Sequence, residues 1–225
     1  MLISCEHAGN EVPDSYSTLF SGANEVLESH RGWDPGAVEV AQLLADQLQV
    51  QFFLMPVTRL LIEMNRSLDN PQLFSEFTNR LTDVEKTNLI DQYYFPYRNS
   101  IEDAIVKASD VVIHLSIHSF TSVLNGEVRN VDVGLLFDPA RKSELEFCSI
   151  LRNKLEKELP EQRIEFNQPY KGTDDGLTTS LRKKFPDHKY LGIEIEINQK
   201  FVGTMLFPSL KQSVLTGIKQ TFNSL

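Results

Sequence analysis

The chain is 225 residues long and 41% hydrophobic, and its 22 basic and 31 acidic side chains give a formal net charge of −9. This acidic balance disfavours binding to nucleic acid or to an anionic membrane surface, and no stretch approaches the roughly 18 continuous apolar residues of a membrane-spanning helix. The length suits one large hydrophobic core, so we expect a single domain over residues 1–225.

The N-terminal segment and the cysteines favour the cytoplasm. Met1 leads directly into a short apolar run, without the basic segment and longer apolar segment of a secretory signal. Cys5 and Cys148 form no CxxC pair, and we expect both to be reduced, buried thiols. These features predict a cytoplasmic protein.

The first predicted strand covers residues 2–6 and is followed by His7, in a polar, turn-prone segment. Residues 37–48 have the apolar spacing of a helix. Asp34 precedes this helix and is suited to be its N-cap, with Pro35 as the first helical residue. From this pattern alone, a capping role and a functional role for Asp34 both remain open.

Two strand-like runs come next, over residues 52–57 and 60–64. The second run ends in Asn65 and Arg66, two polar side chains directly after apolar residues. The first elements therefore alternate between strand and helix. This alternation is typical of an α/β fold.

A helical stretch is predicted to begin at Thr82 and to extend to about residue 109, after a polar loop over residues 70–81. Thr82 and Glu85 have the spacing of a capping box. Pro96 lies inside this stretch and predicts a kink or a break there.

Residues 111–120 predict a buried central strand that carries two histidines. Alternation places His114 and His118 on the same side, about 13 Å apart, so one zinc ion cannot bind both. We favour His118 as a ligand, because it lies at the C-terminal end of the strand, where ligands gather in α/β sheets. We interpret His114 as a hydrogen-bonded core histidine.

The remaining pattern continues the alternation of strands and helices. Predicted strands cover residues 131–137, 164–166 and 190–198, and predicted helices cover residues 142–159, 177–185 and 208–223. Residues 167–176 are rich in turn formers, and we expect them to contact a ligand. Glu194 and Glu196 share one face of the last strand.

Several polar residues fall at strand ends or on otherwise apolar strands: His7, Asp34, Asn65, Arg66, His118, Glu194 and Glu196. Two imidazoles and one carboxylate, with a fourth position left to water, form a common ligand set of catalytic zinc, and a further glutamate is the usual general base. The pattern therefore favours a hydrolytic metal site.

Six segments, in order over nearly the whole chain, resemble the N-formylglutamate amidohydrolase family. They are SCEHAGN, HRGWDPGA, TRLLIEMNRS, LSIHSF, NxPYKGTDDG and IEIEIN. This family is a branch of the zinc carboxypeptidase-like amidohydrolases, with succinylglutamate desuccinylase and aspartoacylase. The resemblance implies a three-layer α/β/α sandwich around a mixed, largely parallel sheet, of the phosphorylase/hydrolase-like kind. It also implies one zinc ion and hydrolysis of an amide on an acidic amino acid.

The resemblance implies roles at matching positions. His7 and His118 match the two zinc histidines, and Glu196 matches the late-strand glutamate that acts as general base. Asn65 and Arg66 resemble the pair that holds the substrate carboxylate in the carboxypeptidase relatives. Glu194 is the alternative base, because it is a second carboxylate on the same face of the strand.

The guanidinium group of an arginine can bind a carboxylate through two hydrogen bonds, which suits an acidic substrate. Arg59 and Arg129 are further candidates for binding its carboxylate, with a structural or solvent-exposed role as the alternative for each. The expected partner is thus a small acidic N-acyl amino acid.

The third zinc ligand departs from the pattern of the relatives. Carboxypeptidases and desuccinylases use HxxE, whereas the residue three positions after His7 is Asn10, a poor zinc ligand. We predict that Asp34 replaces the missing carboxylate, because its WDPGA context resembles the aspartate before the first helix in the formylglutamate branch. Glu6 is the runner-up, although a continuing strand would point it away from His7.

Two other functions remain as alternatives. One is a deacylase or carboxypeptidase that acts on another N-acyl amino acid or a short peptide. The other is a metal-free binding module that kept the fold and lost the chemistry, although every proposed ligand is present. The sequence does not determine the oligomeric state.

Overall fold

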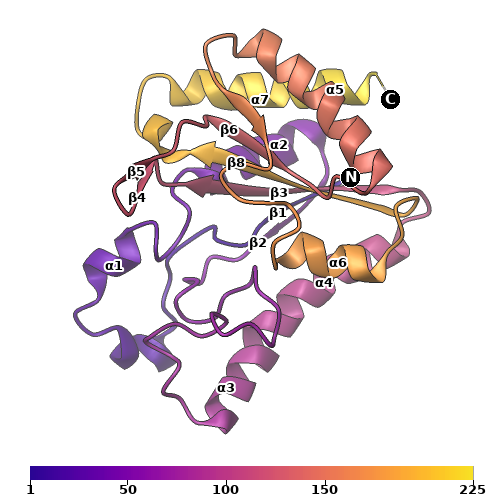
Figure 1. The fold of residues 1–225 in the computed structure, drawn as a ribbon. Coiled ribbons are helices and arrows are strands. Elements are labelled where there is room, and N and C mark those ends of the chain that lie inside the picture. The colour runs from indigo at the N-terminus through magenta and orange to yellow at the C-terminus, as the bar shows by residue number, and fades with distance from the viewer. Residues whose placement is uncertain (225) are drawn as a thin grey trace.

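A six-stranded mixed sheet forms the centre of the computed structural model, which describes residues 1–224 (Figure 1). Its strand order is β2-β1-β3-β8-β6-β7. The strands are β1 (Leu2–Cys5), β2 (Gln51–Leu54), β3 (Val112–Phe120), β6 (Val133–Leu136), β7 (Ile164–Phe166) and β8 (Tyr190–Asn198). The four strands β2, β1, β3 and β8 are parallel, whereas β6 is antiparallel to β8 and β7 is parallel to β6. The carboxyl ends of four strands therefore meet at one edge.

Helices cover both faces of this sheet, which confirms the expected three-layer α/β/α sandwich (Figure 1). One face packs against α2 (Ala37–Leu48), α5 (Lys142–Glu158) and α7 (Phe207–Phe222), and the other against α4 (Phe95–Lys107) and α6 (Leu177–Lys184). Alternation along β1 explains the two layers, because Ile3 packs in the first core and Leu2 in the second. In the described part of the chain, no helix combines the length and hydropathy needed to cross a membrane.

The expected strand over residues 60–64 is wrong: the chain forms consecutive turns there. Leu61 donates its backbone N–H to Thr58 O at 3.0 Å, and Glu63 donates to Leu73 O at 3.0 Å, so the backbone bonds join turns and loops. Leu61 and Met64 are nevertheless buried in the second core. The apolar run therefore reflects packing against the sheet and not a strand, and it brings the following polar residues to the sheet edge.

The helical stretch around Pro96 is continuous. A π-helical turn (Ile90–Tyr94) joins α3 (Asp83–Leu89) to α4, and Pro96 lies in the first turn of α4. The wider turn accommodates a residue that lacks a backbone N–H, so the expected break does not occur.

The remaining short elements lie away from the sheet centre. They are the 3₁₀ segments Asp14–Phe20 and Gln199–Phe201, α1 (Asn24–Glu28) and the hairpin of β4 (Val123–Leu124) and β5 (Glu127–Val128).

The predicted capping box begins α3 and offers a test of local stability. Thr82 Oγ1 accepts the Glu85 backbone N–H at 3.3 Å, and Glu85 Oε2 accepts the Thr82 N–H at 2.8 Å. Thr82→Ala should lower the free energy of unfolding by about 1 kcal/mol, measured by urea denaturation, because it leaves helix N–H groups without their cap. Thr87→Ala, on the exposed face of the same helix, is the control and should change stability by less than about 0.5 kcal/mol. Equal effects of the two changes would contradict a stabilising cap.

Candidate active site

A cavity of about 140 Å³ opens at the edge where the parallel strands end. His7 lies two residues after the end of β1, and His118 lies near the end of β3. His118 is paired in register with Glu196 on β8, so their neighbouring strands present both side chains to this cavity. The sheet thus brings together residues that are up to 189 positions apart, from His7 to Glu196.

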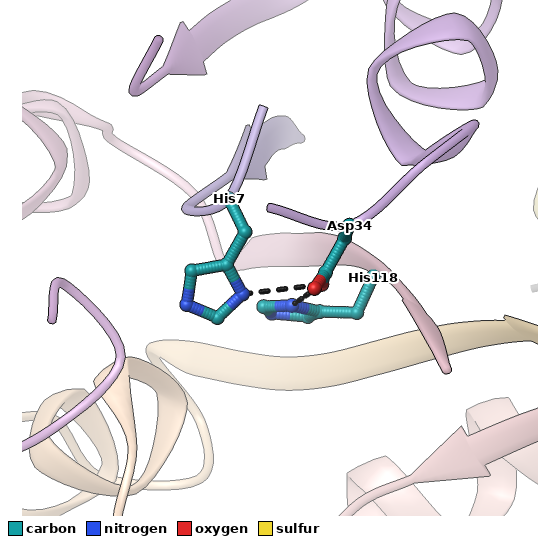
Figure 2. Close-up of side chains that lie close together, drawn as sticks. All are labelled: His7, Asp34 and His118. Atoms are coloured by element: carbon teal, nitrogen blue, oxygen red, sulfur yellow. Dashed lines mark hydrogen bonds and ion pairs between the residues drawn. The ribbon is translucent and has the colours of Figure 1, made fainter. Parts of the chain in front are cut away.

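The structure places His7, Asp34 and His118 around one buried point (Figure 2). Asp34 Oδ2 lies 3.1 Å from His7 Nδ1 and 3.0 Å from His118 Nδ1. The potential ligand atoms of the three residues all lie within 4.8 Å of one another. Two imidazole nitrogens and one carboxylate oxygen form a donor set that suits zinc, and three protein ligands leave a position open.

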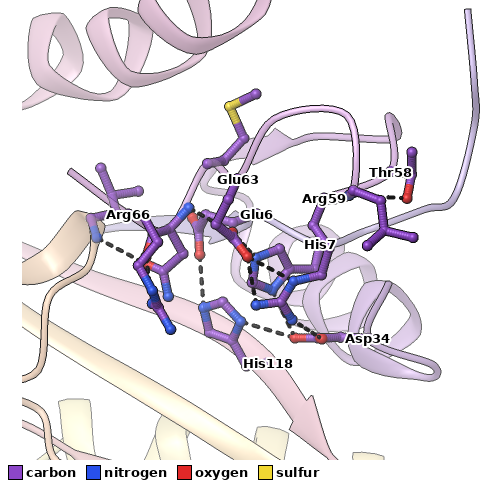
Figure 3. A network of polar contacts seen from close by, with 12 residues as sticks. Glu6, His7, Asp34, Thr58, Arg59, Glu63, Arg66 and His118 are labelled. Atoms are coloured by element: carbon purple, nitrogen blue, oxygen red, sulfur yellow. Dashed lines mark hydrogen bonds and ion pairs between the residues drawn. The ribbon is translucent and has the colours of Figure 1, made fainter. Parts of the chain in front are cut away.

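The outer nitrogens of both histidines contact buried glutamates (Figure 3). His7 Nε2 lies 2.5 Å from Glu63 Oε1, and His118 Nε2 lies 2.8 Å from Glu6 Oε2. Each ring thus lies between two carboxylates, with Asp34 on Nδ1 and a glutamate on Nε2. A carboxylate that keeps the Nε2 proton holds the ring oriented, so that Nδ1 could bind a cation in place of its proton.

Glu6, the runner-up ligand, contacts the far side of the His118 ring. Its carboxylate also accepts hydrogen bonds from Tyr97 OH at 3.0 Å and from Ser116 Oγ at 2.5 Å. This geometry favours Asp34 over Glu6 as the third ligand.

Glu63 was not predicted from the sequence. The one signal in the sequence is a single carboxylate within the apolar run LLIEM, whose pattern also fits a strand.

Asp34 does not cap α2. The residue at the N-cap position is Gly36, whose φ of 81° is readily adopted only by glycine, and no side chain caps the helix there. Helix α2 begins at Ala37, so Pro35 is not its first residue. The Asp34 carboxylate contacts both histidines and Arg59 instead, with Oδ1 accepting from Arg59 Nη1 at 3.2 Å. Of the two roles left open by the sequence, the structure excludes capping.

Opposite charges offset the burial of these ionisable groups. Burial disfavours the charged form of His118, but the hydrogen bonds to Asp34 and Glu6 outweigh it and raise the pKa of His118 well above its usual value. Against the opposing effect of burial, the charge of His7 and the hydrogen bond to His118 lower the pKa of Asp34, and the hydrogen bond to His118 lowers the pKa of Glu6. Ionised carboxylates therefore surround the two imidazoles, and their negative charge favours the binding of a cation.

Glu196 faces the same cavity with one carboxyl oxygen, Oε2, that is buried and without a hydrogen-bond partner among residues 1–224. Burial, together with the negative charges of Asp34 and Glu194, raises the pKa of Glu196 to about 8 against the opposing charge of His118. Glu194 differs, because its Oε1 accepts the Thr178 hydroxyl at 2.5 Å. Of the two glutamates on this face of β8, only Glu196 has a buried, unpartnered oxygen.

The predicted substrate-binding residues line the cavity but differ in their contacts. Arg66 donates through Nη1 to the backbone oxygens of Asn65 at 2.7 Å and Asp175 at 3.0 Å, and its charge has no carboxylate partner in the described chain. Asn65 Oδ1 accepts the backbone N–H of Leu177 at the start of α6, at 2.7 Å. Arg59 instead joins Glu63 and Asp34 (Figure 3). Arg66 is therefore the arginine left to bind an anion.

Two other residues considered from the sequence lie outside the ligand cluster. His114 is a hydrogen-bonded core histidine, as predicted: Nε2 lies 2.6 Å from Ser4 Oγ and Nδ1 lies 2.8 Å from Tyr190 OH. Arg129 donates to Tyr170 OH at 2.9 Å and packs over the Phe120 and Tyr170 rings. Arg129 does not line the cavity itself, whereas its partner Tyr170 does.

Comparison with known proteins identifies the family. A gene product from Agrobacterium tumefaciens, known from its crystal structure, matches with a TM-score of 0.85 and 26% sequence identity, over 99% of this chain and 90% of that chain. An N-formylglutamate amidohydrolase from Ralstonia eutropha matches with a TM-score of 0.70 and 16% identity, over 99% of this chain and 93% of that chain, and so shows the fold. Among curated proteins, none matches the chain. The model of the N-formylglutamate amidohydrolase family matches residues 1–202. The chain belongs to this family and is a hydrolase of amide bonds.

Proposed function

We propose that the protein is a zinc-dependent amidohydrolase that removes the N-formyl group from an acidic amino acid such as N-formylglutamate. The observation that carries the proposal is the single cavity in which three potential metal ligands, an unpartnered carboxyl group and an unpaired arginine meet. These are the groups that metal-assisted hydrolysis of an anionic amide needs. Family membership supports the same reaction.

His7, Asp34 and His118 would hold the zinc ion. Their donor atoms suit zinc in number and kind, and Glu63 and Glu6 on the outer nitrogens keep the two rings oriented. The unpartnered Oε2 of Glu196 also fits, because a nearby cation stabilises a buried carboxylate. Bound zinc would supply Lewis acidity, which polarises a carbonyl group and makes water more acidic.

Glu196 would act as the general base. Its Oε2 takes a proton from the attacking water and then delivers it to the leaving amine as the C–N bond breaks, which releases formate and the free amino acid. Its buried position beside the ligand cluster suits both steps, because the carboxyl group can hold the proton between them. Glu194 would support the site through its bond to Thr178.

Arg66 would bind a carboxylate of the substrate. Arg66→Ala should lower kcat/KM for N-formylglutamate by about 10- to 100-fold, chiefly through KM, because a hydrogen bond to a charged group contributes about 1.5–3 kcal/mol. Kinetics on N-formylglutamate and on an uncharged amide check this result, with zinc content measured in parallel. Arg80→Ala, at an exposed position away from the cavity, is the matched control. An equal loss on the uncharged amide would contradict carboxylate binding by Arg66.

The experiment that tests the function combines metal analysis with a substrate panel. Purified protein should contain about one zinc ion per chain, and among N-formyl, N-acetyl and N-succinyl amino acids it should cleave N-formylglutamate fastest. Faster cleavage of another acyl derivative would assign the protein to the deacylases of other substrates. Absence of bound metal together with absence of cleavage would favour a metal-free binding module.

A further inference from the structure

The acidic groups that line the cavity already have partners within the protein, apart from Glu196. Asp34 is paired with the two histidines and Arg59, and Glu194 accepts from Thr178. The other two lie in the connection between β7 and α6. Asp174 Oδ2 accepts the Lys171 backbone N–H at 3.0 Å, and Asp175 Oδ2 accepts Ser67 N and Asn70 Nδ2 at 2.9 and 2.7 Å.

Two basic side chains in the cavity wall lack such partners. Arg66 donates only to backbone oxygens, and the Lys171 ammonium forms no ion pair or hydrogen bond within residues 1–224. The two come from different segments, Arg66 from the turns after β2 and Lys171 from the connection before α6. Arg66 lies inside the cavity and is partly buried, whereas Lys171 is exposed at its rim, so the lining has two basic side chains that are free to bind an incoming molecule.

The backbone around Lys171 is held in place by hydrogen bonds on both sides. Asp174 closes a turn on it, because the Asp174 N–H donates to Lys171 O at 2.9 Å while the Asp174 carboxylate accepts from Lys171 N. The next residue, Gly172, donates to Asn167 Oδ1 at 2.8 Å and accepts from Arg182 Nη1 at 2.6 Å. These contacts fix the base of the Lys171 side chain at the cavity wall.

Through Gly172, the connection also contacts residues of the protein core. A Cβ at Gly172 would meet the Phe137 backbone N at 2.1 Å, so only glycine allows this close approach. Arg182 in turn donates to Glu144 Oε1 at 2.9 Å, and the Glu144 side chain is fully buried. The connection is thus attached to a charged pair inside the protein, so the Lys171 backbone has a defined position while its exposed side chain extends from the cavity rim.

We propose that Lys171 binds the second carboxylate of a dicarboxylic N-acyl amino acid, while Arg66 binds the first. This inference rests on the proposed function and names the residue that selects acidic over neutral substrates. An amino-acid derivative with two carboxylates can form an ion pair with each of the two unpaired basic side chains, whereas a neutral side chain would form none with Lys171. Lys171 is therefore a determinant of specificity.

The test compares N-formylglutamate with N-formylglutamine, which has nearly the same shape but lacks the second charge. In Lys171→Met, the ratio of kcat/KM for the two substrates should fall by about tenfold or more, through a higher KM for N-formylglutamate. Cleavage of N-formylglutamine should stay within about twofold of the wild-type rate, and Lys171→Arg should retain the preference for glutamate because it retains the charge. Lys183→Met, on the exposed side of α6, is the matched control.

The possible outcomes separate this inference from the proposed function. An unchanged preference in Lys171→Met, or an equal loss on both substrates, overturns the role of Lys171 while hydrolysis of N-formylglutamate by the wild-type protein stands. Wild-type protein that cleaves both derivatives equally well also overturns it. Wild-type protein that cleaves neither derivative overturns the proposed function, and the inference with it.

Discussion

Glu196→Gln should reduce turnover of N-formylglutamate by about a hundredfold or more while the protein keeps its zinc. Glutamine has nearly the shape of glutamate but does not accept the proton of the attacking water. Glu196 is outside the group of three ligands and its Oε2 has no partner in the described chain, so the substitution removes no metal ligand and breaks no hydrogen bond of that oxygen. Steady-state kinetics and zinc analysis of the same preparation measure the two properties together.

Glu194→Gln is the matched comparison for this experiment. Same-face residues on a strand are about 6.7 Å apart, so only one of the two glutamates lies within one water of the metal ligands. A glutamine at position 194 still accepts the Thr178 hydroxyl through its amide oxygen, and we expect a smaller loss of turnover. If the Glu194 variant lost turnover with zinc retained while the Glu196 variant remained active, the two roles would have to be exchanged.

The positions of the site residues follow from features that are local in the sequence. The apolar alternation of β3 and β8 and the polar residues at their ends are visible without a structure. Parallel strands end at the same edge, so His118 and Glu196 become neighbours once the strands pair. The capping box at Thr82 and the bounds of α2 could also be predicted, because both depend on residues within a few positions of one another.

The contacts of Glu63 and Glu6 could not be predicted, because they depend on tertiary packing. Residues 60–64 are as apolar as a strand, and only their position over the sheet determines that they form turns and bring Glu63 to His7. Similarly, a glutamate at the end of β1 has several possible partners, and the one it meets, His118, lies 112 positions away. The local pattern around Asp34 does not distinguish an N-cap from a ligand of distant histidines, and only the family resemblance favours the ligand.

Asp34→Asn should remove most of the zinc and lower turnover by more than a hundredfold. The amide preserves the size of the side chain, but its neutral oxygen is a poor zinc ligand, and the Nδ1 atoms of His7 and His118 would be the only protein donors left. Zinc per chain after dialysis against a mild chelator is the measurement. Thermal unfolding shows whether the variant still folds, because Arg59 also loses the charge of its partner.

Glu6→Gln is the control that separates a metal ligand from a residue that orients one. Glu6 contacts the outer nitrogen of His118, and loss of such a partner costs about 10- to 100-fold in metal affinity. At saturating zinc, the Glu6 variant should therefore bind close to one ion per chain, whereas the Asp34 variant should not. The reverse result, with zinc retained by Asp34→Asn and lost by Glu6→Gln, would make Glu6 the third ligand and require His118 to bind the metal through Nε2.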